Sequence, residues 1–253
     1  MKARILLISM FCCLFSLAHA QIGQHRDDLS LGFNGGYILS TVGFNPSVSQ
    51  NNHGGITGGL SFRYTCEKYF NTICSVYAEV NYASLGWEEN IVDIKDAAVI
   101  DPETNKKQQY SRTINYVQIP FLAHLAWGRE KKGMQFFVNA GPQLGFYLSE
   151  STKSNFNLGD EISRIKKGTT ERSNTIWAQD TMSVENKLDY GIAAGIGAEY
   201  TVPHAGHFLL EARYYYGLGN IYGDSKRDYF GKSNYGNIVI KFSWLFDITR
   251  TKK

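Results

Sequence analysis

The sequence predicts an all-β fold: an eight-stranded antiparallel transmembrane β-barrel with short periplasmic turns and long extracellular loops. Three observations carry this prediction. Apolar and polar residues alternate with period 2 in eight segments, short and long connections between the segments alternate strictly, and aromatic residues gather at the segment ends. Together these patterns are typical of small barrels of the bacterial outer membrane.

The composition favours strands over helices and excludes some function classes. Among 253 residues there are 16 Tyr, 15 Phe and 25 Gly but only 5 Pro, and aromatic residues are enriched in strands. The formal net charge of +3 falls close to zero without Lys2 and Arg4 at the N-terminus. A nearly neutral chain has no overall field to hold a polyanion, so we expect no nucleic-acid partner.

The N-terminus predicts a secretory signal peptide over residues 1–20, which leaves residues 21–253 as one barrel domain. Two basic residues precede an apolar run, and the segment ends in the small-x-small sequence Ala18-His19-Ala20. The apolar run from Ile5 to Ala18 is too short to span a bilayer as a helix, and no later stretch is long enough.

Eight amphipathic segments account for the ordered part of the chain. In each of them one parity is apolar, as with Ile192, Ile196 and Tyr200, while the other is rich in Gly, Asn, Ser, Glu and Arg. A soluble barrel would need a mostly apolar interior, so we expect the apolar parity to face lipid. The segments cover residues 31–40, 56–65, 76–83, 116–127, 135–146, 188–200, 208–216 and 237–246.

The connections predict the orientation of the barrel. The links 67–73, 128–133 and 202–206 are short, whereas the others are long, and the link from Glu150 to Asn186 is the longest and rich in Ser, Thr and Asn. Such asymmetry predicts short turns and both termini in the periplasm, with solvated loops outside the cell. Aromatic residues at the strand ends, among them Trp127 and Trp244, predict a girdle at the lipid headgroups.

Two stretches resemble a known family. The sequence Ile114-Asn-Tyr-Val-Gln-Ile-Pro120, followed by Phe137-Val-Asn-Ala-Gly-Pro142 with Gly145 behind it, resembles the PorT-like outer-membrane β-barrel family. The resemblance implies an eight-stranded barrel in the outer membrane of a Gram-negative cell envelope. Because the founding member is linked to a specialised secretion system, it also implies envelope or secretion-system proteins as partners, besides the outer-membrane lipid.

The inward parity predicts a lumen charge network. An eight-stranded barrel is narrow enough for its own side chains to fill it, and charges cut off from bulk water need partners. We interpret the set as a charge-paired plug, with a proton path or a small polar ligand site as the alternative. The residues are Arg63, Glu79, Asp189, Glu199, Glu211, Arg213 and Lys241.

The two cysteines beyond the signal peptide predict a disulfide. Cys66 ends one strand, Cys74 opens the next, and both have the outward parity at the two ends of a short turn. Neighbouring strands at such a hairpin bring Cα atoms within disulfide range, and the periplasm is oxidising. Two free thiols facing lipid are the alternative.

The chain carries little sign of catalysis, and we predict no catalytic, cofactor or metal site. Only His124 lies mid-strand on the inward parity, and Ser243 is inward as well, but no acid is placed by the sequence to complete a hydrolytic site. His204 and His207 flank a turn, where two ligands alone do not define a metal site. The predicted function is therefore that of a non-enzymatic surface-binding or export-assisting protein, with a lipid-modifying hydrolase or acyltransferase as the alternative.

Overall fold

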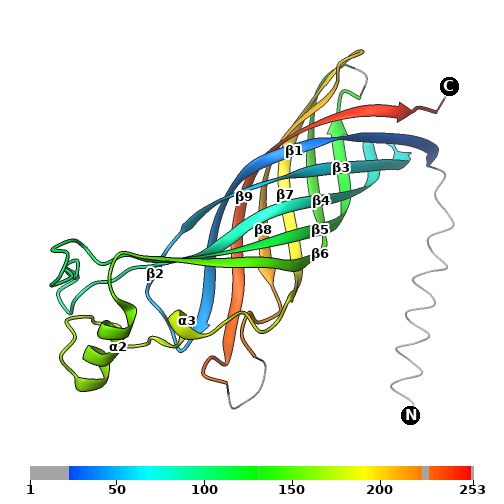
Figure 1. The fold of residues 1–253 in the computed structure, drawn as a ribbon. Helices are drawn as coiled ribbons and strands as arrows, with labels where there is room; N and C mark the ends of the chain where they lie inside the picture. Colours follow the sequence, from blue (N-terminus) through cyan, green and yellow to red (C-terminus); the bar gives the residue numbers. More distant parts are fainter. Residues whose placement is uncertain (1–22, 131, 224–227, 252–253) are drawn as a thin grey trace, which may run out of the picture.

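The computed structural model describes residues 23–130, 132–223 and 228–251 (Figure 1). The predicted signal peptide, residues 1–20, lies outside the described residues. The strands are β1 (Gln24–Asn45), β2 (Gln50–Asn51), β3 (His53–Tyr69), β4 (Thr72–Glu89), β5 (Tyr110–Gly128), β6 (Gly133–Ser154), β7 (Leu188–Val202), β8 (Gly206–Gly217) and β9 (Lys232–Thr249). Two short helices, α2 (Leu158–Lys167) and α3 (Ala178–Thr181), lie between β6 and β7.

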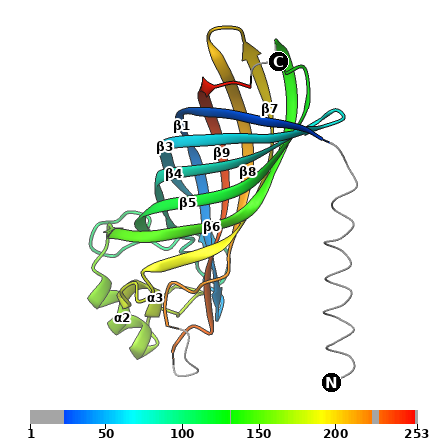
Figure 2. The ribbon, with the colours of Figure 1, turned by 90° about the vertical axis from the view of Figure 1, so that its right-hand side faces the viewer.

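Eight of the strands close into an antiparallel barrel. The order β4-β3-β1-β9-β8-β7-β6-β5 is completed by pairing of β4 with β5, and β2 is a two-residue addition to the end of β4. β1 pairs with β9, so the first and last strands seal the ring (Figure 2). The predicted eight-stranded antiparallel barrel is confirmed. No helix in the described part of the chain is long and apolar enough to cross a membrane.

The barrel has two unlike ends, which we call the turn rim and the loop rim. The turn rim carries the connections 70–71, 129–132 and 203–205 together with the outer ends of β1 and β9, and the loop rim carries 46–52, 90–109, 155–187 and 218–231. Figure 1 shows α2 and α3 at the opposite end of the barrel from the C-terminal end of β9. The first turn is shorter than predicted, because Lys68 and Tyr69 still pair with Ile73 and Thr72.

The predicted alternation places the apolar parity on the outside. Phe33, Ile196 and Leu210 are each more than half exposed, as expected of side chains that meet lipid. Near the turn rim the rings of Phe208 and Trp244 stack with their centroids 5.7 Å apart, and the ring centroids of Trp244 and Phe246 are 4.4 Å apart. These outward aromatics occupy the position expected of an interfacial girdle.

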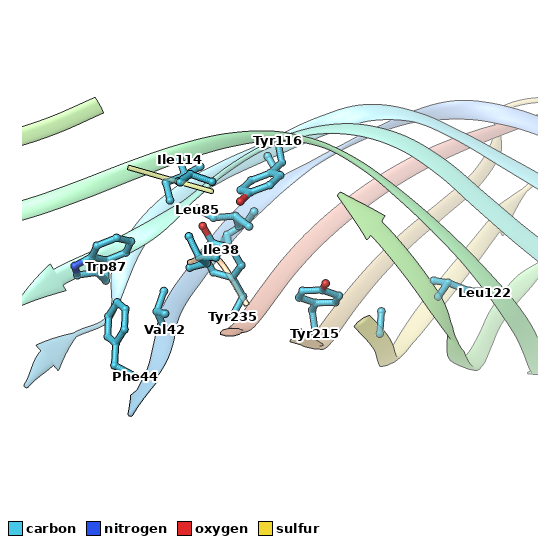
Figure 3. Packing of buried hydrophobic residues seen from close by; sticks show 14 of the residues in the cluster. Ile38, Val42, Phe44, Leu85, Trp87, Ile114, Tyr116, Leu122, Tyr215 and Tyr235 are labelled. Atoms are coloured by element: carbon cyan, nitrogen blue, oxygen red, sulfur yellow. The ribbon is translucent and has the colours of Figure 1, made fainter. Parts of the chain in front are cut away.

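The inward parity is more apolar than the sequence indicated. Figure 3 shows Trp87, Phe44, Ile38, Tyr116 and Tyr235 packed inside the half of the barrel nearer the loop rim. The rings of Phe44 and Trp87 meet edge to face at 5.3 Å, and Tyr116 meets Tyr235 at 5.8 Å. In this half the inward side chains therefore form an apolar core in place of a mostly polar lumen.

Candidate functional site

The centre of the lumen is closed by four charged side chains, which we call the ionic plug: Glu79, Glu211, Arg213 and Lys241. Arg213 donates to Glu79 and to Glu211, in each case at 2.9 Å. Lys241 pairs with Glu79 and lies 3.4 Å from Glu211. All four side chains are at least 95% buried, and two anions balance two cations. Such an arrangement satisfies buried charges that would be costly alone.

Amides extend the plug across the barrel. Asn34 donates to Asn81 and Ser61 at 2.8 Å, and Asn81 donates to Glu79 at 2.7 Å. Asn139 donates to Glu211 at 3.0 Å from the opposite wall. The plug is thus tied to both sides of the barrel.

A second ionic group lies nearer the turn rim. Arg63 reaches across the lumen to Glu199 at 2.6 Å, and Glu199 also contacts His207 Nδ1 at 2.6 Å. The other ring nitrogen of His207, Nε2, lies 3.0 Å from Asp247. His207 and Asp247 were not included in the predicted network, since His207 was assigned to a turn.

Asp189, the seventh predicted member, stands apart from both groups. Its carboxylate accepts a hydrogen bond from the hydroxyl of Tyr215 at 2.7 Å, on the loop side of the plug. The structure therefore joins six of the seven predicted residues in two ion-pair groups and gives Asp189 a neutral partner.

A cavity of about 720 Å³ lies between the second ionic group and the turn rim. Charged and hydroxyl side chains line it together with Ile73 and Ala126. Arg26 at its mouth pairs with Glu130 from the β5–β6 turn. Its polar lining includes Arg63, Thr65, Ser75, His124, Glu199 and His207.

Neither inward histidine has the surroundings of a hydrolytic site. His124 Nδ1 lies 2.7 Å from the amide oxygen of Asn139, and its ring packs against Tyr77 and Phe137. His207 has the carboxylate of Glu199 beside Nδ1 and that of Asp247 beside Nε2. The hydroxyl of Thr201 also lies 3.0 Å from Nδ1. A ring held by two carboxylates is suited to a structural role rather than to taking a proton from a hydroxyl.

The structure also places the potential metal ligands and the two cysteines. Among the described residues no group of three or more His, Cys, Asp or Glu is arranged to hold a metal ion. Cys66 and Cys74 are free thiols, and Cys66 Sγ donates to the carbonyl of Cys74 at 3.3 Å. The predicted disulfide is not formed in this structure, where a bulge pairs Glu67, not Cys66, with Cys74.

At the loop rim, α3 lies over the mouth of the barrel. Arg112 of β5 donates to the carbonyl of Gln179 at 3.0 Å and to Glu150 at 2.6 Å. Gln179 in turn donates to Glu89 at the end of β4. Burial, and then the neighbouring Glu89 carboxylate, raise the pKa of Asp180 to about 9. α3 is thus held as a strap by charged and amide groups that are hidden from solvent.

The two longest connections fold together into a body that we call the platform: residues 90–109 and 155–176. Its small core consists of Ile91, Val99 and Phe156 packed with Tyr110, the first residue of β5. Glu161 of α2 accepts from Gln108 at 3.1 Å and from Thr170, and Arg172 donates to Gln108 at 2.9 Å. Most of residues 155–176 are exposed or half-buried, as predicted for a solvated loop, but Glu161 and Arg172 are buried.

The charge of Glu161 is stabilised inside the platform. Burial alone would raise the pKa of this carboxyl, but hydrogen bonds from Thr170 and Gln108 and the cations Arg172 and Arg164 hold it below its ordinary value. Asn157 caps the first turn of α2 by accepting from Gly159 at 3.0 Å. The sequence signal for this helix was Asn157 followed by Asp160 and Glu161, a typical helix start.

The fold and the plugged lumen define a transmembrane β-barrel protein. The chain belongs to the family described as outer membrane protein beta-barrel domain, whose model matches residues 19–223. It is accordingly a protein of the Gram-negative outer membrane. No curated protein matches the sequence.

Several solved barrels are similar in fold. Ail of Yersinia pestis, in complex with the heparin analogue sucrose octasulfate, is 13% identical, with 87% of this chain and 99% of that chain covered at a TM-score of 0.34. Neisserial surface protein A is 10% identical, with coverage of 86% and 97% and a TM-score of 0.40. OprG from Pseudomonas aeruginosa is 11% identical, with coverage of 88% and 98% and a TM-score of 0.36.

Proposed function

We propose that this protein is a non-enzymatic, PorT-like surface-binding barrel whose loop rim faces the cell exterior and whose termini lie in the periplasm. The platform carries the proposal. Its two connections share a buried core and a hydrogen-bonded carboxylate, so they present a preformed surface. A preorganised surface binds a partner at a lower entropic cost than mobile loops do.

The closed lumen supports a role at the surface over conduction. The ionic plug fills the centre, and aromatic side chains with α3 fill the half nearer the loop rim. A solute would have to displace both layers to cross. The lumen charges, on this proposal, serve to hold the barrel shut.

A role in export is the second candidate, and the turn-rim cavity favours it. In the proposed orientation this cavity opens toward the periplasm, where secretion-system proteins would meet the barrel. The PorT-like resemblance points the same way. The two candidates differ in which rim contacts a partner.

The lipid-modifying enzyme is disfavoured by the site geometry. His124 faces Asn139, and the wall of the barrel separates it from lipid on the outside. Purified protein assayed on labelled lipid tests this directly. Turnover that disappears in His124→Ala but survives in Tyr215→Phe would overturn the non-enzymatic proposal.

Photo-crosslinking on intact cells tests which rim binds. A photoreactive residue replaces Ile94 or Lys167 on the platform, or Arg129 on the turn rim as the matched control. All three side chains are exposed. Surface binding predicts specific adducts from the platform positions and none from Arg129. Adducts from Arg129 alone would replace this function with the export role, and adducts from no position would contradict both.

A further inference from the structure

The far part of β6 is a strand with a partner on one side only. β6 pairs with β7 as far as Phe146, whereas its pairing with β5 continues to Ser154. The last contact on the β7 side is the hydrogen bond that the Tyr147 amide donates to the carbonyl of Lys187. Residues 148–154 therefore form a sheet edge, which we call the free edge. Figure 1 shows this part of β6 extending away from the barrel toward α2.

The register fixes the direction of the backbone groups along the free edge. Residues of an antiparallel strand turn their N–H and C=O groups alternately toward one neighbour and toward the other side. The amide of Asn155 donates to a carbonyl of β5, so the odd-numbered residues before it also face β5. The N–H and C=O groups of Glu150, Thr152 and Ser154 therefore point away from β5.

The free edge is uncovered in the described part of the chain. All of its residues are exposed except Glu150, which is half-buried. Among the described residues, none outside β5 forms a backbone hydrogen bond with residues 148–154. Proteins usually protect a strand edge with proline or with a covering segment, because its unpaired backbone groups are a template for another strand. An uncovered edge of this length indicates a place where a partner binds.

The backbone chemistry of the free edge matches an extended peptide. Its outward N–H and C=O groups recur at every second residue, which is roughly 7 Å along a strand. Another β-strand presents donors and acceptors with the same repeat, so it can pair along the whole edge. Such strand addition is a common way for proteins to bind extended segments.

The charges of the free edge favour an acidic partner over a second copy of this chain. Glu150 is already paired with Arg112 at 2.6 Å. Lys153 is exposed, and no described residue forms an ion pair with it. A second copy of the edge would bring another Lys153 and no available acid. An acidic segment would instead place a carboxylate beside Lys153, as opposite charges on neighbouring strands do.

We propose that the free edge binds an extended, acidic peptide segment of a partner protein by strand addition. Glu150, Thr152 and Ser154 supply the backbone hydrogen bonds, and Lys153 supplies the charge that faces the acid. The free edge leads directly into residues 155–176 of the platform, so the two are parts of one binding surface. This inference rests on the proposed surface-binding function and names the class of partner.

The test follows the backbone amides of the free edge by NMR in protein labelled with ²H and ¹⁵N and held in lipid nanodiscs. The probe is the synthetic peptide acetyl-Thr-Glu-Val-Glu-Val-Glu-Thr-amide. The same peptide N-methylated at every residue is the control, because it has no N–H to donate. Strand addition predicts a saturable shift and slower hydrogen exchange at the amides of residues 150, 152 and 154. The amides of residues 149, 151 and 153, which already face β5, should change little.

Two matched changes sharpen the test. Thr152→Pro removes one outward N–H, which an edge strand tolerates, and should weaken binding of the probe about tenfold. Thr152→Val keeps this N–H and should bind as the parent does. A probe with lysine in place of each glutamate would face Lys153 with a like charge and should bind about threefold more weakly.

Several results would overturn the proposal. These are no response to the probe, equal responses at even and odd residues, equal binding of the N-methylated or lysine peptide, and slow exchange at residues 150, 152 and 154 before the probe is added. The comparison of even and odd amides needs only the parent protein, so it stands even where Thr152→Pro fails to fold. Crosslinking from Ile94 or Lys167 does not use the free edge, so adducts there with no response to the probe would overturn this inference alone.

Discussion

The two halves of the lumen differ in how their side chains fill it, although the same eight strands line both. Toward the turn rim charged side chains surround a cavity, whereas toward the loop rim aromatic side chains pack tightly beside the buried charges of Arg112 and Glu89. The difference follows the connections. The turns at one end are too short to cover the lumen, while the long loops at the other end bring α3, Tyr222 and Phe230 over it. An open mouth stays hydrated and tolerates ion pairs, and a covered mouth packs as a protein core does.

The ionic plug between the two halves is where a single change should have the largest effect. Glu79→Leu leaves Arg213 and Lys241 buried with one carboxylate between them. Removing one partner from a buried ion pair costs about 3–5 kcal/mol. We expect a loss of that size in the free energy of unfolding, measured by urea titration with the heat-modifiable gel shift as the signal.

Glu103→Leu is the matched control for this change, since Glu103 is exposed in the loop 90–109. It makes the same replacement without uncovering a buried charge and should change the free energy of unfolding little. Equal unfolding curves for both variants would show that the plug does not stabilise the barrel.

The outer face of the barrel should be the next most sensitive. Ile196→Arg puts a charge on the lipid side mid-strand, which costs about 2–4 kcal/mol near the membrane midplane. The fraction of heat-modifiable protein should fall accordingly. Glu171→Arg in the exposed part of the platform should leave that fraction unchanged. Normal folding of Ile196→Arg would mean that this parity does not face lipid.

The covered mouth should respond to pH through Asp180. Its pKa rises from 3.8 to about 9 in the fold, so the folded state keeps a proton that the unfolded chain loses. The stability of the strap is therefore complete below about pH 3.8 and declines as the pH rises toward 9. Asp180→Asn should remove this decline. It should raise the free energy of local opening of α3 by on the order of 1 kcal/mol, because α3 can open without unfolding the barrel.

Hydrogen exchange at Ala178–Thr181 measures this effect once the intrinsic pH dependence of exchange has been removed. The Asn variant should exchange more slowly than the parent at neutral and alkaline pH and equally at acid pH. Identical protection of the two proteins at every pH would mean that the Asp180 carboxyl is not buried when α3 is in place.

The strand alternation could be read from the sequence because the apolar parity must meet lipid along the whole barrel. The same reasoning located Arg63, Glu79 and Lys241 on the inner face. It could not find the partners, since Arg63 and Glu199 meet across the lumen and the register of distant strands is not encoded locally. His207 was missed for a similar reason: it looks like a turn residue until β8 is seen to begin at Gly206.

The platform core and the bulge at Cys66 could not be predicted for another reason. A stretch rich in Ser, Thr and Asn reads as solvated when it is considered alone, yet Glu161 becomes buried because the loop 90–109 supplies Gln108. The disulfide prediction assumed an unbroken register, and a single-residue bulge beside Cys66 removed it. Contacts between loops, and bulges, depend on the tertiary structure and leave little trace in local periodicity.

Orientation is the claim on which the proposed function depends most, and cysteine labelling measures it directly. Single cysteines replace Glu103 in the loop 90–109 or His204 in the turn 203–205, in a background without Cys66 and Cys74, and intact cells are treated with an impermeant maleimide. The account predicts that the Glu103 position is labelled on intact cells and the His204 position only after the outer membrane is permeabilised. Labelling of the His204 position on intact cells would contradict it.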